Sequence, residues 1–262
     1  MDKISVFLAD WQVLFREGIH FTLSGEEDIE VIGEATDSED ALKAIEANPP
    51  DVAVLNTDRD KLDGVRITGY LRQNYPSVSV LLIMDSDSEE HLFLAMKRGA
   101  SACLTKETEP ADLVDCIRAV AKGGHPISDA LLRPEIASRV LDEFEEFTVI
   151  SEQVDNLLAR LTPGEVEILH QVANRTPIEQ ICQALGISEE SISRSFGFVM
   201  TKLVANDHIR QVIAAAQTSL SPLSIRARLA GQSSTEYVTR DEFTAFKNSL
   251  RDRLKVVTDE TD

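Results

Sequence analysis

Five short aliphatic runs alternate with five amphipathic stretches through residues 1–125, and this alternation constrains the fold more than any other feature of the sequence. The runs are continuously apolar, which is typical of strands buried on both faces of a parallel sheet. Amphipathic helices between such strands would cover both faces, so the sequence predicts a doubly wound α/β domain with a five-stranded parallel sheet. The predicted strands are residues 4–9, 29–34, 52–55, 78–84 and 102–105, and the predicted helices are residues 13–23, 38–48, 64–74, 89–98 and 110–122.

Four of the predicted strands end at a residue that could contribute to a site. In a doubly wound sheet, the ligand crevice lies outside the carboxyl ends of the strands. Asp10, Asn56, Met84 and Lys106 occupy those positions on the first, third, fourth and fifth strands. Asn56 is the most informative of them, because an amide lacks a nucleophilic carboxylate oxygen and therefore cannot form an acyl phosphate.

A second, all-helical domain is predicted to begin at Thr162. Thr162, Pro163 and Glu165 together have the pattern of a capping box with proline at the first helical position. A short helix near residues 177–185 and a long one near residues 189–204, with apolar residues at helical spacing, should follow. We thus expect a first domain at residues 1–126, a helical linker at 127–160 and an all-α domain at 161–216. The linker is either a solvated connector or a helix used for dimerisation or interdomain contact.

Residues 217–262 are predicted to form a linker followed by a C-terminal amphipathic helix. A capping-box pattern at residues 239–242 opens this helix. One of its faces carries Phe243, Phe246, Leu250 and Leu254, and another carries Lys247, Arg251 and Lys255. An isolated helix of this length is marginal in water, so we expect it to dock on the rest of the protein or on a second copy.

Sequence motifs in both halves resemble those of a known family. The first half contains VFLAD at 6–10, FREG at 15–18, EVIGEA at 30–35, PDVAVL at 50–55 and GASACLTK at 99–106, and the second contains LTPGE at 161–165 and LGIS at 185–188. In this order they resemble the NarL/FixJ response regulators of two-component systems, over about residues 1–216. The resemblance implies a flavodoxin-like receiver domain followed by a LuxR-type helix-turn-helix domain that binds DNA.

The resemblance also shows where this chain departs from an active receiver. A receiver requires an aspartate nucleophile, a Mg²⁺ ion held by that aspartate and an acidic pair, a hydroxyl group and a lysine. At the matching positions this chain has Asn56 for the nucleophile, Asp10 and Trp11 for the acidic pair, and Met84 for the hydroxyl residue. Only Lys106 is retained. A degenerate receiver, or pseudo-receiver, with no metal and no cofactor is therefore expected.

Three interpretations of this pocket remain open from the sequence. A neighbouring acid such as Asp58 or Asp85 could accept a phosphoryl group in place of Asn56. Lys106 could instead bond to Asp10 or to the Asn56 carbonyl group and hold a single conformation. Because Trp11 and Met84 make the crevice more apolar, it could also bind a small ligand or a partner's side chain.

The resemblance places the groove-facing positions of the recognition helix at Ser193, Arg194 and Gly197. Arginine can bond to guanine through two hydrogen bonds, serine can bond to a base or a phosphate, and glycine allows only a close backbone approach. Predicted contacts to the DNA backbone are Thr162, Ser191 and Lys202. The alternative for Arg194 and Lys202 is a solvated helix face with no nucleic-acid role.

The formal net charge of −19 weakens any non-specific attraction to nucleic acid, and most of the excess acid lies in the first half. No apolar run reaches the length of about 18 residues that a membrane span requires, and the N-terminus does not resemble a signal peptide, so we expect a cytoplasmic protein. No Ser/His/Asp, paired-carboxylate or metal-ligand pattern is evident, and the three cysteines are widely spaced, so we do not expect an enzyme.

Two functions follow from these features. The first is a phosphorylation-independent response regulator that binds promoter DNA as a homodimer. The second is a protein-interaction regulator that binds the transcription machinery or another regulator without specific DNA binding. The small number of basic residues in 161–216 and the glycine at position 197 favour the second.

Overall fold

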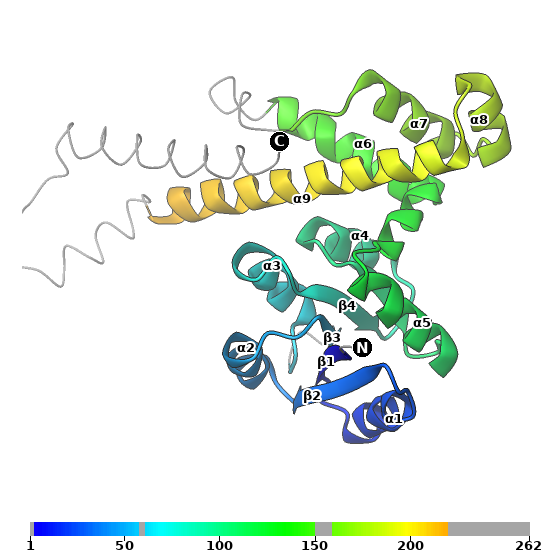
Figure 1. Ribbon diagram of the computed structural model, residues 1–262. Helices are drawn as coiled ribbons and strands as arrows, with labels where there is room; N and C mark the ends of the chain where they lie inside the picture. The colour runs from blue at the N-terminus through cyan, green and yellow to red at the C-terminus, as the bar shows by residue number, and fades with distance from the viewer. Residues whose placement is uncertain (1–2, 58–60, 150–158, 220–262) are drawn as a thin grey trace, which may run out of the picture.

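The computed structural model describes residues 3–57, 61–149 and 159–219. Its α/β part contains a five-stranded sheet in the order β2-β1-β3-β4-β5, with every neighbouring pair parallel. This confirms the predicted fold class (Figure 1). The strands are β1 (Ile4–Ala9), β2 (Ile29–Ala35), β3 (Val52–Asn56), β4 (Ser79–Met84) and β5 (Ala102–Thr105), and the helices between them are α1 (Val13–Ser24), α2 (Ser38–Ala47), α3 (Gly64–Asn74), α4 (Glu89–Arg98) and α5 (Pro110–Ala121).

Two layers of helices cover the sheet, and each encloses a separate part of the core. Helices α1 and α5 bury residues such as Ile19 and Ile117 against one face. Helices α2, α3 and α4 bury residues such as Ile45 and Met96 against the other. All of the described side chains of β3 are buried, which explains why its sequence is continuously apolar up to Asn56.

The remaining described elements are helical. They are the 3₁₀ helix η1 (Pro126–Leu132), α6 (Pro134–Val149), α7 (Pro163–Ala173), α8 (Ile178–Leu185) and α9 (Glu189–Ser219). The capping box at the start of α7 is confirmed, since the Thr162 hydroxyl accepts from the Glu165 N–H and the Glu165 carboxylate accepts from the Thr162 N–H. None of the described helices is long and apolar enough to span a membrane.

Helix α9 is longer than the sequence predicted. The expected end near residue 204 is wrong, because the helix continues to Ser219 and passes through the expected domain boundary at 216. No glycine or proline follows Gly197 within the helix, so nothing in the local sequence stops it. Its buried stripe also changes character, from apolar residues such as Phe196 and Leu203 to the polar residues Asn206 and Asp207.

The second half of α9 packs against α4 and α6 through charged side chains, which we call the interdomain ion cluster. Lys97 Nζ of α4 lies 2.5 Å from Glu143 Oε1 of α6 and 3.7 Å from Asp207 Oδ1 of α9. Arg98 Nη1 lies 3.4 Å from Asp207 Oδ2, and Arg210 Nη1 lies 3.0 Å from Glu143 Oε1. Figure 1 shows the resulting arrangement, with α9 extending across the α4 side of the α/β part.

This packing favours the interdomain alternative for the linker helix over a solvated connector. Ile136, Val140 and Phe144 of α6 are buried in the core that also contains residues of α4, α7 and α9. Residues 150–158 of the linker and the predicted helix at 239–255 lie outside the described residues. The division of the chain at 126, 160 and 216 remains a prediction.

Candidate functional site

The carboxyl edge of the sheet brings the predicted crevice residues together. Asp10 directly follows β1, Asn56 ends β3 and Met84 ends β4. Lys106 follows β5 and donates its backbone N–H to the carbonyl oxygen of Met84 at 3.2 Å. Parallel strands that begin at the same edge necessarily end at the same edge, so the strand positions alone account for this grouping.

Asn56 forms a buried hydrogen bond with Asp10. Asn56 is 1% exposed, and its Nδ2 donates to Asp10 Oδ2 at 2.8 Å. The other Asp10 oxygen, Oδ1, accepts from the backbone N–H of Gln12 at 2.7 Å. Both carboxylate oxygens of Asp10 therefore have donors, and the amide satisfies a buried charge that a second carboxylate would repel.

Lys106 is held by residues that we did not predict. Its Nζ donates to Gln12 Oε1 at 2.6 Å and forms a close ion pair with Asp85. The interpretation in which Lys106 bonds to Asp10 or to the Asn56 carbonyl group differs from these described contacts, because Gln12 at the start of α1 and Asp85 after β4 accept from the ammonium group instead. Asp85, considered above as a substitute phosphate acceptor, is thus a partner of the lysine.

The remaining two positions are apolar or aromatic. Met84 is buried in the same core as α4 and carries no hydroxyl group. The Trp11 indole lies beneath Lys61, whose Nζ is 3.5 Å from the ring centroid, a cation–π geometry. The Trp11 Nε1 atom is buried and has no hydrogen-bond partner among the described residues. A lysine ammonium thus lies over the aromatic ring that directly follows Asp10.

Gly64, the first residue of α3, allows the backbone to pass close to Asn56. A Cβ atom at this position would lie 2.2 Å from the Asn56 carbonyl oxygen and 3.1 Å from Leu55 Cβ. Real Cβ atoms do not approach backbone oxygens this closely, so only glycine fits without moving β3 or α3.

The six predicted DNA-contact residues lie on or beside α7 and α9. Ser193 and Arg194 are exposed on α9, and no heavy atom would lie within 4 Å of a Cβ at Gly197. The Thr162 hydroxyl is used in the capping box, and the Ser191 hydroxyl lies 3.0 Å from that of Ser188. The structure therefore presents Ser193, Arg194 and Gly197 along one stretch of helix.

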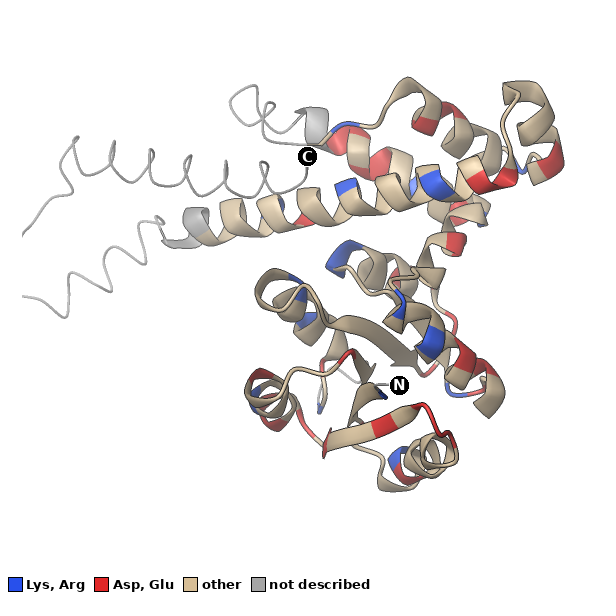
Figure 2. Ribbon diagram, viewed as in Figure 1, with Lys and Arg blue, Asp and Glu red and all other residues tan. Residues whose placement is uncertain are grey.

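Every basic residue of 161–216 is ion-paired within the chain. Lys202 Nζ lies 2.7 Å from the buried carboxylate of Glu165, and Arg194 Nη2 lies 3.2 Å from Glu190 Oε1 on the exposed surface of α9. Arg175 pairs with Glu135, and Arg210 pairs with Glu143. Figure 2 shows the acidic and basic segments next to each other at the start of α9. Of the two predicted cationic contacts, Lys202 is the more constrained, because moving it away from Glu165 would leave the buried Glu165 carboxylate without a cationic partner.

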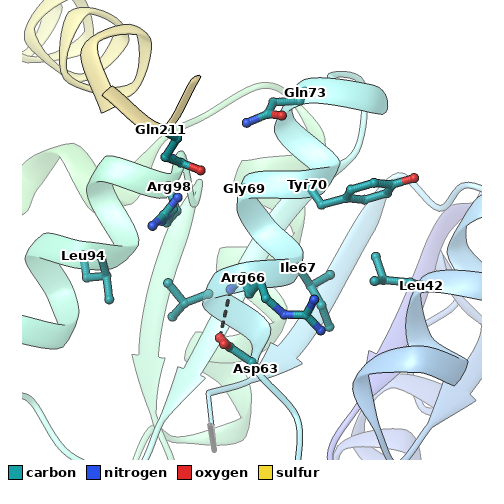
Figure 3. Close-up of a pocket in the computed structure, with 11 residues that line it drawn as sticks. Leu42, Asp63, Arg66, Ile67, Gly69, Tyr70, Gln73, Leu94, Arg98 and Gln211 are labelled. Atoms are coloured by element: carbon teal, nitrogen blue, oxygen red, sulfur yellow. Dashed lines mark hydrogen bonds between the residues drawn. The ribbon is translucent and has the colours of Figure 1, made fainter. Parts of the chain in front are cut away.

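A hollow of about 540 Å³ adjoins α3, α4 and the second half of α9. Its lining includes Arg66, Arg98 and Gln211 (Figure 3). Arg98 lies between α3 and α4, whereas Arg66 points along the side of α3 that faces Leu42. The two guanidinium groups do not converge, so the hollow does not present a common anion site.

Comparison with known proteins identifies the α/β part. The response regulator receiver domain family matches residues 6–118. Because of this match, we refer to this segment as the receiver domain. The uncharacterized transcriptional regulatory protein YxjL of Bacillus subtilis (strain 168) is 29% identical over 222 residues, which are 84% of this chain and 98% of the relative. The transcriptional regulatory protein DegU of Brevibacillus brevis is 29% identical over 223 residues, which are 81% of this chain and 92% of the relative.

Two solved structures are also similar to parts of this chain. The signal receiver domain of the putative response regulator NarL from Mycobacterium tuberculosis is 33% identical and covers 47% of this chain and 99% of its own, with a TM-score of 0.46. The response regulator ChrA of a haem-sensing two-component system is 25% identical and covers 84% and 100%, with a TM-score of 0.42.

A second charged network supports the crevice of the receiver domain from β2. Arg16 Nη1 donates to the carbonyl oxygen of Asp10 at 2.8 Å, and Arg16 Nε lies 2.7 Å from Glu34 Oε2. Glu34 also forms a close hydrogen bond with His20 Nδ1. Partial burial alone would raise the pKa of Glu34, but the hydrogen bonds from His20 and Arg16 outweigh it and hold this pKa below its usual value. Glu34 is thus an anion that keeps Arg16 in place behind Asp10.

Proposed function

We propose that this protein is a DNA-binding transcriptional regulator whose receiver domain is not controlled by phosphorylation. The observation that carries the proposal is the buried hydrogen bond between Asn56 and Asp10. An amide cannot attack a phosphoryl donor, and here it also occupies the carboxylate that would otherwise bind the metal. The two relatives named above are both called transcriptional regulatory proteins, which supports the output activity.

The crevice residues do not fit a magnesium ion. Mg²⁺ prefers oxygen ligands and usually binds through one or two carboxylates. Asp10 is the single acid retained at the matching positions, and both of its oxygens already accept hydrogen bonds. Trp11 adds an indole N–H, which cannot be a ligand, and the Lys61 ammonium lies over that ring. At these matching positions a cation would therefore meet one occupied carboxylate and a neighbouring positive charge.

For DNA binding we propose that Arg194 and Ser193 contact base edges, with Gly197 allowing close approach of the helix. Thr162, Ser191 and Lys202 would contact phosphates. Arg194 is the strongest candidate, because its exposed pair with Glu190 is weak in water and can be exchanged for a base. We further propose that the protein acts in the cytoplasm as a homodimer.

The second candidate function is a protein-interaction regulator that does not bind specific DNA. The pairing of all four basic residues of 161–216 favours it, because affinity for DNA depends on cations that can neutralise phosphates. In this case the acidic receiver domain would contact the transcription machinery or another regulator.

Selection of bound sequences from random DNA with the full-length protein, followed by titrations across a salt series, separates the two functions. The first predicts an enriched motif, a steep salt slope and an affinity unchanged by acetyl phosphate with magnesium. It also predicts that Arg194→Ala weakens binding by about 1–3 kcal/mol and relaxes one base preference. Arg175→Ala, which removes the same charge from the same segment, is the matched control. No enrichment and no binding at low salt would favour the interaction regulator.

A further inference from the structure

Phe198 of α9 exposes an aromatic ring to solvent. It is 56% exposed, whereas Phe196 and Val199 beside it in the sequence are buried in the core. A single exposed apolar side chain is ordinary on a protein surface. The ring of Phe198 is informative because of its position on the helix and because of the residue that precedes it.

Phe198 lies on the same side of α9 as the proposed groove-facing residues. It follows Arg194 by four residues, and residues four apart lie on one face of a helix. Ser193, Arg194 and Thr201 are exposed together with it. Four residues advance a helix by about 6 Å, and neighbouring base pairs are about 3.4 Å apart. A helix that placed Arg194 on a guanine would therefore bring the ring to within about two base pairs of it.

Gly197, directly before the ring, is not required by packing inside the chain. No heavy atom lies within 4 Å of a Cβ built at this position. Glycine inside a helix destabilises it relative to alanine. The missing side chain instead leaves room beside Phe198, so that an external surface can approach the backbone of α9 and lie against the ring.

The same stretch of α9 carries little positive charge. Residues 189–201 contain one basic residue, Arg194, against two acidic residues, Glu189 and Glu190. Arg194 is paired with Glu190 in the free protein. With so few cations to neutralise phosphates, contacts that do not depend on charge must supply more of the recognition. In the major groove, the C5-methyl group of thymine is the apolar group that a side chain such as phenylalanine can contact.

We propose that Phe198 packs against the C5-methyl group of a thymine in the major groove and determines specificity at that base pair. The inference rests on the DNA-binding function proposed above and adds a second base contact to that of Arg194. Gly197 makes the contact possible by letting the helix backbone come close to the base edges. The predicted target therefore has a thymine within about two base pairs of the guanine that Arg194 contacts.

Replacing single thymines with deoxyuridine tests the contact, because uracil differs from thymine only in lacking the methyl group. Selection from random DNA with the full-length protein supplies the duplex, and the guanine is the base whose preference Arg194→Ala relaxes. For the wild type, replacing one thymine near this guanine should weaken binding about three- to fivefold, as expected for one buried methyl group. Phe198→Ala should bind the thymine and uracil duplexes equally.

Two further variants make the comparison specific. Phe21→Ala removes an 82% exposed phenylalanine from α1 and is the matched control, so it should keep the wild-type ratio of thymine to uracil affinity. Phe198→Leu keeps an apolar side chain and should retain part of the preference for thymine. Since Phe21 and Phe198 are both exposed, the melting temperature of all three variants should stay close to that of the wild type.

The outcomes separate this inference from the proposed function. A selected site with no thymine near the guanine, or an equal effect of uracil on the wild type and Phe198→Ala, would overturn the methyl contact and leave DNA binding intact. Unchanged DNA affinity and selectivity in Phe198→Ala would also overturn it and would assign the exposed ring to a protein partner. No enriched sequence and no binding at low salt would overturn both the inference and the DNA-binding function.

Discussion

The Asn56 side-chain amide donates to the Asp10 carboxylate at 2.8 Å inside the crevice of the receiver domain. The pair is buried, and each group meets the other's requirement, since the carboxylate needs donors and the amide needs an acceptor. An amide at position 56 therefore makes a contact with Asp10 that a second carboxylate could not make without a cost in free energy. This relationship leads to the first prediction.

Asn56→Asp should destabilise the protein rather than restore the switch. Two buried carboxylates at this separation repel, so the pKa of one must rise and the free energy of unfolding at pH 7 should fall by about 1–3 kcal/mol. Urea denaturation at pH 7 and pH 4 would measure this, and the loss should be smaller at pH 4, where one acid is protonated. With Trp11 and Met84 still present, we expect no covalent label from acetyl phosphate.

Exchanging the two residues provides the control. Asp10→Asn combined with Asn56→Asp keeps one amide and one carboxylate, and the amide oxygen at position 10 can still accept from the Gln12 N–H. This double variant should regain most of the stability that Asn56→Asp loses. A double variant less stable than both single variants would show that the pair does not act as described.

Gly64→Ala should lower the free energy of unfolding by about 1–3 kcal/mol, as overpacked substitutions typically do. The new methyl group would meet the Asn56 carbonyl oxygen at 2.2 Å, and a strand backbone cannot move aside as a flexible side chain can. Gly18→Ala is a suitable comparison, because it lies inside α1 with open space around it and should stabilise by about 0.5–1 kcal/mol. Equal effects of the two substitutions in urea denaturation would contradict this explanation.

The lowered pKa of Glu34 predicts a pH dependence. A carboxyl group whose pKa is lower in the folded state stabilises the fold fully above its unfolded pKa, near 4.3, and loses this contribution as the pH falls through the folded value. The difference in unfolding free energy between the wild type and Glu34→Gln should thus be largest near neutral pH and should shrink below about pH 4. A difference that stays constant from pH 7 to pH 3 would mean that Glu34 acts through packing and not through its charge.

The interdomain ion cluster should contribute more than an ordinary surface pair. The side chains of Lys97 and Glu143 are only 13% and 11% exposed, so water screens their attraction poorly. A double-mutant cycle with Lys97→Met and Glu143→Gln should give a coupling energy of about 1–3 kcal/mol. The exposed pair of Lys43 and Glu39 on α2 is the control and should give about 0.5 kcal/mol or less. Similar coupling in the two cycles would place the cluster among weak surface contacts.

Sequence reasoning located the strands and the crevice because both depend on local pattern. A strand buried on both faces has to be apolar throughout, as Val52 to Leu55 are, and the residue after it has to lie at the sheet edge. The lack of a carboxylate nucleophile at Asn56 follows from the residue type alone, since an amide is not a nucleophile in any fold. The contacts of Gln12 with Lys106 and of Lys61 with Trp11 could not be predicted in this way. The partners are 94 and 50 residues apart in the sequence, and a polar side chain on a loop or at a helix end does not indicate which distant residue it will contact.

The sequence by itself determined the order of strands and helices, the capping box at Thr162 and the absence of a nucleophilic carboxylate at position 56, because each depends on residues that are neighbours along the chain or on one side chain's own chemistry. Tertiary structure alone decided which acid holds Lys106, how far α9 continues, and that Lys202 and Arg210 are bound to Glu165 and Glu143. Charge pairing depends on distance in space, and the acids that pair with these cations come from helices and loops far apart in the chain.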